Sequence, residues 1–134
     1  MRRLACAALV LAADGAVRAA LPIGTVLAEV LPGRHEVELC VAVGESPPGC
    51  GPAEAFADER GGIRVRVSDI VYRLDVQDGA VDVIVMHGTM QIDEFLAAGE
   101  WAGTRLKFHD RKKDARYDVR FAEGAVRTRR QDSR

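Results

Sequence analysis

The segment IVYRLDVQDGAVDVIVMH, residues 70–87, decides the fold class that we expect for this chain. Two runs rich in β-branched residues flank Asp78-Gly79, a dipeptide typical of the two-residue type I′ turn of a β-hairpin. Such a turn pairs Gln77 with Ala80, and side chains alternate between the two faces of each strand. One face of the hairpin is therefore entirely apolar and consists of Tyr72, Leu74, Val76, Val81, Val83 and Val85.

Strand signals also lie upstream of this hairpin. Pro32-Gly33 suits a type II turn and would join residues 23–31 with residues 34–43 in a first hairpin. Nearer the central hairpin, apolar and basic residues alternate over 63–67, with the apolar side chains at odd-numbered positions. From Ser68-Asp69 onward, the side chains that face the core are at even-numbered positions instead. A change of phase requires a bulge or a tight turn, so we expect one at that point.

A third hairpin is predicted downstream. It joins TRLKFH (104–109) with ARYDVRF (115–121) across the polar loop DRKKD (110–114). Both strands alternate apolar and polar residues, as expected for a sheet with one buried face. The side chains on the core face are Leu106, Phe108, Tyr117, Val119 and Phe121.

Two short helices complete the expected fold. PAEAFADER (52–60) begins with Pro52 and is stopped by Gly61-Gly62, and QIDEFLAAG (91–99) ends at Gly99. A chain of 134 residues has room for one domain, and its Val-rich core favours sheet. We therefore predict a mainly β fold, an antiparallel β-sandwich or open barrel of about seven strands with one or two short helices.

The N-terminus has the three-part pattern of a secretory signal peptide. A positive start precedes the apolar run LACAALVLAA (4–13), and small residues precede a cleavage point after Ala19. The alternative is that residues 4–12 form a buried strand, followed by a hairpin turn at Asp14-Gly15. We expect a signal peptide over 1–19, a single β-rich domain over 20–126 and a basic flexible tail over 127–134.

The cysteines predict one disulfide. Loss of Cys6 with the signal peptide leaves Cys40 and Cys50, and an even pair in an exported domain is typical of a disulfide. The Pro- and Gly-rich stretch AVGESPPG (42–49) can bring the two together, with Cys40 directed away from the core and toward a covering loop. Two free buried thiols are the alternative in a cytosolic chain. No second pair of ligands with zinc spacing accompanies them, so no metal site is expected.

Composition and charge restrict the class of protein. Apolar residues make up 48% and charged residues 29% of the chain, as in soluble globular proteins. No apolar run reaches the ~18 residues of a membrane span, so we expect no transmembrane segment. Residues 28–100 hold fourteen acids against five arginines, whereas residues 105–134 hold eleven basic residues against five acids. This asymmetry indicates either a solvated face with a basic tail or a surface for an anionic partner.

The third hairpin carries the candidate binding surface. Alternation places basic side chains on the face opposite Leu106 and Phe108, interrupted only by Asp118, and the connecting loop adds three more. Arginine offers a bidentate fork to carboxylate or phosphate. The alternative role of these charges is to prevent edge-to-edge pairing of strands. The candidate residues are Arg105, Lys107, His109, Arg111, Lys112, Lys113, Arg116 and Arg120.

No catalytic residue and no cofactor are expected. The three histidines lack the helical spacing of metal ligands. Asp75 and Asp82 fall opposite each other in the central hairpin, where an acid–base pair or a Ca²⁺ site is the alternative to two solvated carboxylates. A G-x-S-x-G motif and a phosphate-binding glycine loop are absent from the sequence, and Trp101 is expected in the core.

These observations predict a periplasmic or extracellular binding protein without catalytic activity. The class most consistent with the charge asymmetry is an inhibitor or immunity-type protein that binds another protein, and we expect the surface of that partner to be acidic. The first alternative is an envelope accessory or structural domain that binds a polyanionic surface, such as a cell-wall or lipid polyanion. The second alternative is a small hydrolase that uses His109 or His87. Nucleic acid is not expected, because no aromatic residues interleave with the basic ones.

Overall fold

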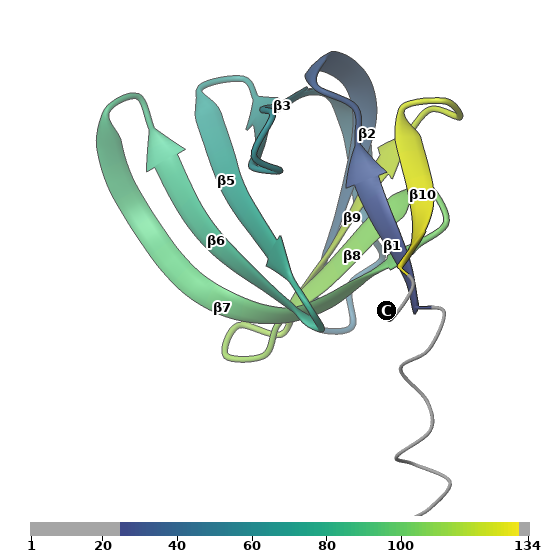
Figure 1. Ribbon diagram of the computed structural model, residues 1–134. Helices are drawn as coiled ribbons and strands as arrows, with labels where there is room; N and C mark the ends of the chain where they lie inside the picture. Colours follow the sequence, from purple (N-terminus) through teal and green to yellow (C-terminus); the bar gives the residue numbers. More distant parts are fainter. Residues whose placement is uncertain (1–24, 132–134) are drawn as a thin grey trace, which may run out of the picture. The chain divides into compact units, whose positions relative to one another are not determined.

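Eight consecutive antiparallel strands form a closed barrel in the computed structural model, which describes residues 25–131 (Figure 1). Each strand pairs with the next along the chain, and the last pairs back with the first. The predicted mainly β, antiparallel class is confirmed, although the barrel is closed and has eight strands instead of seven. The strands are β2 (Gly33–Val43), β3 (Gly49–Ala57), β4 (Ile63–Val67), β5 (Ile70–Gln77), β6 (Ala80–His87), β7 (Met90–Ala102), β8 (Arg105–Asp110) and β9 (Ala115–Phe121).

The β5–β6 hairpin has the predicted turn and register. Gln77 lies opposite Ala80, and the inward side chains of the two strands face one another in the predicted pairs. Gly79 has a φ of +75°, in the left-handed region that a type I′ turn requires. The predicted turn at Ser68-Asp69 also forms and joins β4 to β5. Local turn chemistry and strand alternation therefore specify this part of the barrel.

The predicted first hairpin at Pro32-Gly33 is wrong. β1 (Thr25–Val30) pairs with β10 (Val126–Gln131) in a two-stranded sheet. β2 pairs with β3 along one edge and, from Val37 onward, with β9 along the other, so most of the length that the predicted hairpin would use is already paired. The turn signal describes local geometry only, and it carries no information about closure by a strand that lies far away in the sequence.

Both predicted helices are wrong, because residues 52–57 belong to β3 and residues 91–99 belong to β7. In β3, Ala55 and Ala57 are buried, whereas Phe56 between them is exposed. In both segments, hydrogen bonding along the sheet and burial of alternate residues outweigh a helix preference of less than ~1 kcal/mol per residue. The described residues form no helix, and so none that is long and apolar enough to cross a membrane.

Small and β-branched side chains fill the barrel. Leu106 and Val83 are fully buried in its interior. Gly99 allows the wall to approach the core, because a Cβ there would lie 2.7 Å from Val81 Cγ2 and 2.8 Å from Phe108 Cβ. The interior is therefore packed closely enough that one added methyl group has no room.

The barrel belongs to a compact unit, Ala28–Arg127. Within this unit Val30 and Ala125 are buried against the barrel core. Trp101, predicted to lie in the core, is half-buried, and its ring centroid lies 5.6 Å from that of Phe121. The predicted signal peptide lies outside the described residues, and β10 extends into the segment for which we expected a flexible tail.

Candidate functional site

The outer face of β8 and β9 brings together the basic side chains of the predicted site that belong to these strands. Leu106 and Phe108, which alternate with them on β8, are buried in the core. A groove of about 620 Å³ runs along this face, and the small residues Ala42, Ala98 and Gly99 contribute to its lining. Three cross-strand pairs form the face, Arg105 with Arg120, Lys107 with Asp118, and His109 with Arg116.

Asp118 pairs with two of the arginines, and Glu38 supplies a second carboxylate to one of them. Arg105 forms two hydrogen bonds with its carboxylate, of which Nε to Oδ1 measures 3.3 Å. Arg120 Nε lies 3.3 Å from Asp118 Oδ2, and Arg120 Nη1 lies 3.1 Å from Glu38 Oε1. Burial by itself would raise the pKa of Asp118, but the bonds and charges of the two arginines outweigh it and lower this pKa. The hydrogen bond to Asp118 also raises the pKa of Arg105.

Asp114 in the connecting loop holds two more of the predicted residues. Its Oδ1 lies 2.9 Å from His109 Nε2 and 3.5 Å from Arg116 Nη1. The Arg116 guanidinium also donates to the Gly44 carbonyl at 2.8 Å, which ties the loop after β2 to β9. These two side chains thus hold loops in place at the end of the groove.

Lys113 points away from the basic face, toward the end of the barrel where β8 turns into β9. Its ammonium pairs with Asp93 of β7, lies 3.1 Å from Asp110 Oδ2 and sits 4.7 Å from the centroid of the Phe95 ring. The hydrogen bond between Lys113 and Asp93 raises the pKa of the lysine and lowers that of the aspartate. Asp110 is only 3% exposed, and Lys113 supplies the charge that balances it.

Sequence reasoning missed the acidic partners of Lys113. Asp93 lay in a segment predicted to be helical, and Asp110 was assigned to a polar loop. The spacing of three residues between Asp110 and Lys113 is the one local signal of their contact. Nearby, Tyr72 and Tyr117 are half-buried with ring centroids 5.8 Å apart, and burial raises the pKa of both.

Three of the eight predicted residues keep an unpaired charge. Lys107, Arg111 and Lys112 are exposed and form no ion pair within the described part of the chain, although the charge of Lys112 helps to lower the pKa of Asp93. The other five are held by acids of this molecule. The face therefore has a lower net charge than the sequence pattern suggests, and its free cations lie on β8 and in the loop that follows it.

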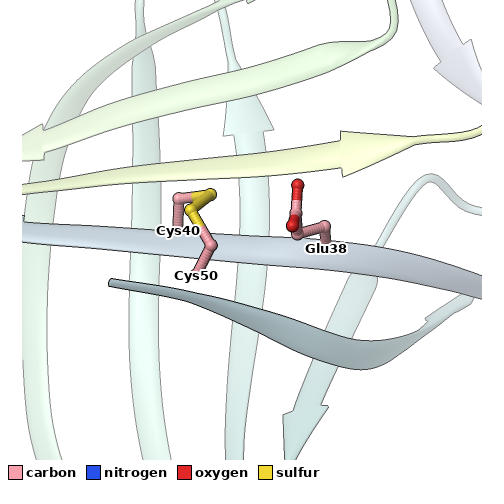
Figure 2. Close-up of side chains that lie close together, drawn as sticks. All are labelled: Glu38, Cys40 and Cys50. Carbon is pink, nitrogen blue, oxygen red and sulfur yellow. A yellow bond between two sulfur atoms is a disulfide. The ribbon is translucent and has the colours of Figure 1, made fainter. Parts of the chain in front are cut away.

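Cys40 and Cys50 form the predicted disulfide, with an S–S distance of 2.06 Å. The two residues face each other directly on β2 and β3, so the neighbouring strand takes the place of the covering loop that we expected. Figure 2 shows Glu38 beside Cys40 on β2, and its carboxylate lies within 4.8 Å of the two sulfur atoms. The disulfide uses both thiols and Arg120 binds Glu38, so this cluster is a cross-link next to an ion pair.

The remaining candidate residues lie apart from the basic face. Asp75 and Asp82 face each other across β5 and β6 as predicted, and Gln77 Nε2 donates to Asp75 at 3.5 Å. His35 Nε2 lies 2.6 Å from the Leu31 carbonyl oxygen. His87 is exposed at the end of β6, a different strand from the one that carries His109.

The outer face of β8 and β9 thus combines a groove, two arginines that pair with acids of this chain and the exposed Lys107, and the turn after β8 adds Arg111 and Lys112. Such a surface is suited to binding carboxylates, because the free cations can accept an anion without losing a partner. A comparison of this chain with protein-family models, with curated proteins and with solved structures finds no match.

Proposed function

We propose that this chain is an exported binding protein without catalytic activity, and that it docks an acidic partner protein on the outer face of β8 and β9. The observation that carries the proposal is a group of three exposed cations that form no ion pair within the described residues. Lys107 lines the groove of about 620 Å³, and Arg111 and Lys112 lie in the turn that follows β8. An inhibitor or immunity-type protein is the class that best fits a small, cross-linked barrel with a charged docking face.

The free cations are the side chains expected to contribute most to such an interaction. A carboxylate of the partner can approach them without displacing an acid of the same face. Arg105 and Arg120, in contrast, would exchange Asp118 for the partner's acid and gain little. Charges at the edge of an interface act mainly on the association rate, over a Debye length of about 8–10 Å in physiological salt.

The disulfide supports an exported protein. Cys40 lies opposite Asp118 on the neighbouring strand, so the cross-link is part of the wall that carries the groove. A disulfide is compatible with an oxidising compartment such as the periplasm or the extracellular space. It also holds β2 and β3 together beside the proposed docking face.

The experiment compares two triple charge reversals of the full chain as baits for proteins from the native host. One variant carries Lys107→Glu, Arg111→Glu and Lys112→Glu. The control carries Arg60→Glu, Arg66→Glu and Arg73→Glu, which change the net charge equally on the opposite wall, in the turn before β4, in β4 and in β5. We expect a stoichiometric protein that wild type and control retain, that the first variant loses, and that salt releases.

Equal retention by both variants would contradict the proposal. Arg105 is left unchanged because its reversal would remove one of the two guanidinium groups that pair with the half-buried Asp118 and would place a second acid beside it. The same three proteins are then tested on vesicles of anionic lipid. Binding to vesicles together with loss of every protein partner would identify the envelope accessory domain as the better description.

A further inference from the structure

Glu38, Cys40 and Cys50 lie side by side on the outer face of the barrel wall. Residues i and i+2 of a strand point to the same face, and so does the residue directly opposite on the next strand. Glu38 and Cys40 have the first relation on β2, and Cys50 faces Cys40 from β3 (Figure 2). Sequence spacing did not identify this group as a metal site, because its members come from two facing strands.

The three side chains offer two sulfur atoms and one carboxylate at the spacing of ligands around a single metal ion. Their donor atoms lie within 4.8 Å of one another. Two sulfur ligands at ~2.3 Å from a tetrahedral Zn²⁺ ion are roughly 3.8 Å apart. Rotation about the Cα–Cβ bonds of Cys40 and Cys50 brings the sulfurs to that separation once they are no longer bonded to each other. Reduction of the disulfide therefore converts this group into three ligands.

The surroundings of the group allow an ion to enter and to bind. Cys50 and Glu38 are exposed, so an ion can approach from solvent, whereas Cys40 is only 3% exposed and closes the inner side. Arg120 lies 3.1 Å from the Glu38 carboxylate and 3.3 Å from that of Asp118. Arg120 thus keeps an acidic partner when Glu38 turns to a metal ion, and no charge is left without a partner.

The ligand set selects the class of ion. Thiolates are soft ligands that favour Zn²⁺, whereas Ca²⁺ and Mg²⁺ require oxygen ligands. Two thiolates and one carboxylate carry three negative charges, of which a divalent ion neutralises two. Three protein ligands leave the fourth position of a tetrahedral ion to a water molecule. The group is therefore suited to a thiophilic divalent cation and not to an alkaline-earth ion.

We infer that the reduced chain binds one Zn²⁺ ion through Cys40 Sγ, Cys50 Sγ and a carboxylate oxygen of Glu38. The disulfide and the zinc site are then alternative states of one group of side chains, and oxidation of the thiolates releases the ion. This site goes beyond the proposed docking function and does not depend on it, because none of the three cations reversed to test that function is a ligand.

A dithiol supplies the two electrons that open the disulfide. One of its thiolates attacks the sulfur of the exposed Cys50, the bond to Cys40 breaks, and Cys40 leaves as a thiolate. The second thiolate of the reductant then displaces Cys50 and closes a disulfide within the reductant. Overall, the protein disulfide, the dithiol and Zn²⁺ give the zinc dithiolate, the oxidised reductant and two protons.

The test titrates the full chain with Co²⁺, which replaces Zn²⁺ in tetrahedral sites and shows a thiolate-to-cobalt charge-transfer band. All samples carry Cys6→Ala, because Cys6 is the third cysteine of the chain and lies outside the described residues. The protein is reduced with dithiothreitol, which is then removed in the absence of oxygen. We expect the reduced chain to bind one equivalent of Co²⁺, Zn²⁺ to displace it, and the oxidised chain to show no such band.

Glu38→Gln tests the third ligand. Glu36→Gln is its matched control, because Glu36 is an exposed acid on the same face of β2, two residues before Glu38. We expect Glu38→Gln to weaken Co²⁺ binding at least roughly tenfold and Glu36→Gln to weaken it less than about threefold. Absence of the charge-transfer band from the reduced chain would overturn the inference, and so would equal affinities of the two variants.

A titration in urea covers the case in which reduction by itself unfolds the chain. Ligands on two facing strands meet only in the folded barrel, so we expect the reduced chain in urea to bind Co²⁺ at least roughly tenfold more weakly than in buffer. Equal binding in urea and in buffer would show that the two thiols bind the ion without the fold, and the inferred site would be wrong.

Discussion

The two halves of β7 belong to one strand but differ in how their backbone groups are satisfied. Residues 98–102 pair with β8, whereas among the described residues 90–97 have only β6 as a partner strand. The cause is length, because β7 has 13 residues and β8 has only 6. A barrel can thus be closed in topology and still expose an edge. The first half of β7 carries exposed apolar side chains, and the second half carries Gly99 against the core.

Hydrogen exchange of backbone amides should give the largest contrast between neighbouring residues. Gly99 N–H donates to the turn that precedes β6, and N–H directions alternate along a strand, so the N–H of Ala97 faces β6 and that of Leu96 points away from it. We expect Ala97 to exchange at least about a thousandfold more slowly than Leu96, because its opening requires sub-global or global unfolding. The measurement is native-state exchange followed by NMR. Similar protection of the two amides would show that another segment covers the edge.

Truncation of two leucines compares a buried side chain of β8, beside the paired half of β7, with an exposed side chain in the first half of β7. Leu106 of β8 is 0% exposed and Leu96 is 70% exposed. We expect Leu106→Ala to lower the free energy of unfolding by ~2–5 kcal/mol, because it leaves a cavity in the packed core. Leu96→Ala should change it by no more than ~0.5 kcal/mol. Urea denaturation measures both values, and a large loss for Leu96→Ala would mean that this side chain is buried in solution.

Removal of the disulfide tests a wall that lies away from the open edge. Cys40→Ala together with Cys50→Ala should lower the free energy of unfolding by about 2.5–3 kcal/mol, because the unfolded chain gains loop entropy. The change should not abolish the difference in exchange between Leu96 and Ala97, since β2 and β3 do not contact this edge through their ladders. The control is the wild type with reductant. An unchanged stability in both samples would indicate that the two thiols are not linked.

Gly99→Ala tests close packing in the paired half of β7. The new Cβ would lie within 2.9 Å of the Lys107 carbonyl oxygen and closer still to Val81 and Phe108. We expect a loss of ~1–3 kcal/mol in the free energy of unfolding. Gly51→Ala is the matched control on β3, where a Cβ would meet nothing within 4 Å. An equal loss of stability for the two substitutions in thermal denaturation would show that the neighbours of Gly99 can move apart to accommodate a methyl group.

Asp118→Asn should have the smallest effect, and that effect should depend on pH. The pKa of Asp118 is lower in the folded chain than the ordinary value of 3.8. Its carboxylate therefore stabilises the fold fully above that value, and this contribution is lost as the pH falls through the lowered pKa. We expect Asp118→Asn to cost about 1 kcal/mol near neutral pH and less at about pH 3. A loss that is the same at both pH values would exclude the charge as its origin.

The parts of the fold that local chemistry controls could be predicted from the sequence. The turn at Asp78-Gly79, the disulfide and the shared face of Arg105 and Lys107 follow from turn residues, cysteine number and strand alternation. Closure of β9 on β2 could not be derived, because it depends on a pairing between distant segments. The helices were predicted wrongly because Pro52, Gly61-Gly62 and Gly99 are only local signals of a helix start or stop, whereas pairing with neighbouring strands decides the structure of β3 and β7.

The candidate site shows the same division. Alternation identified which side chains share a face, but it could not identify the acids that neutralise them. Asp118 was the one acid recognised on the face, whereas Glu38 comes from a strand 82 residues away in sequence from Arg120. The open edge of β7 was also hidden from the sequence, because it arises from the unequal lengths of two strands that follow each other.

The link between Cys40 and Cys50 has a mechanical consequence. When the folded chain is drawn out by its ends, the ten residue steps between the two cysteines cannot extend. A fully extended segment of that length would contribute about 33–36 Å. Most of this length is removed from the contour of the unfolded oxidised chain, and reductant restores it. A single-molecule extension record would therefore report the redox state of the barrel as a difference in length.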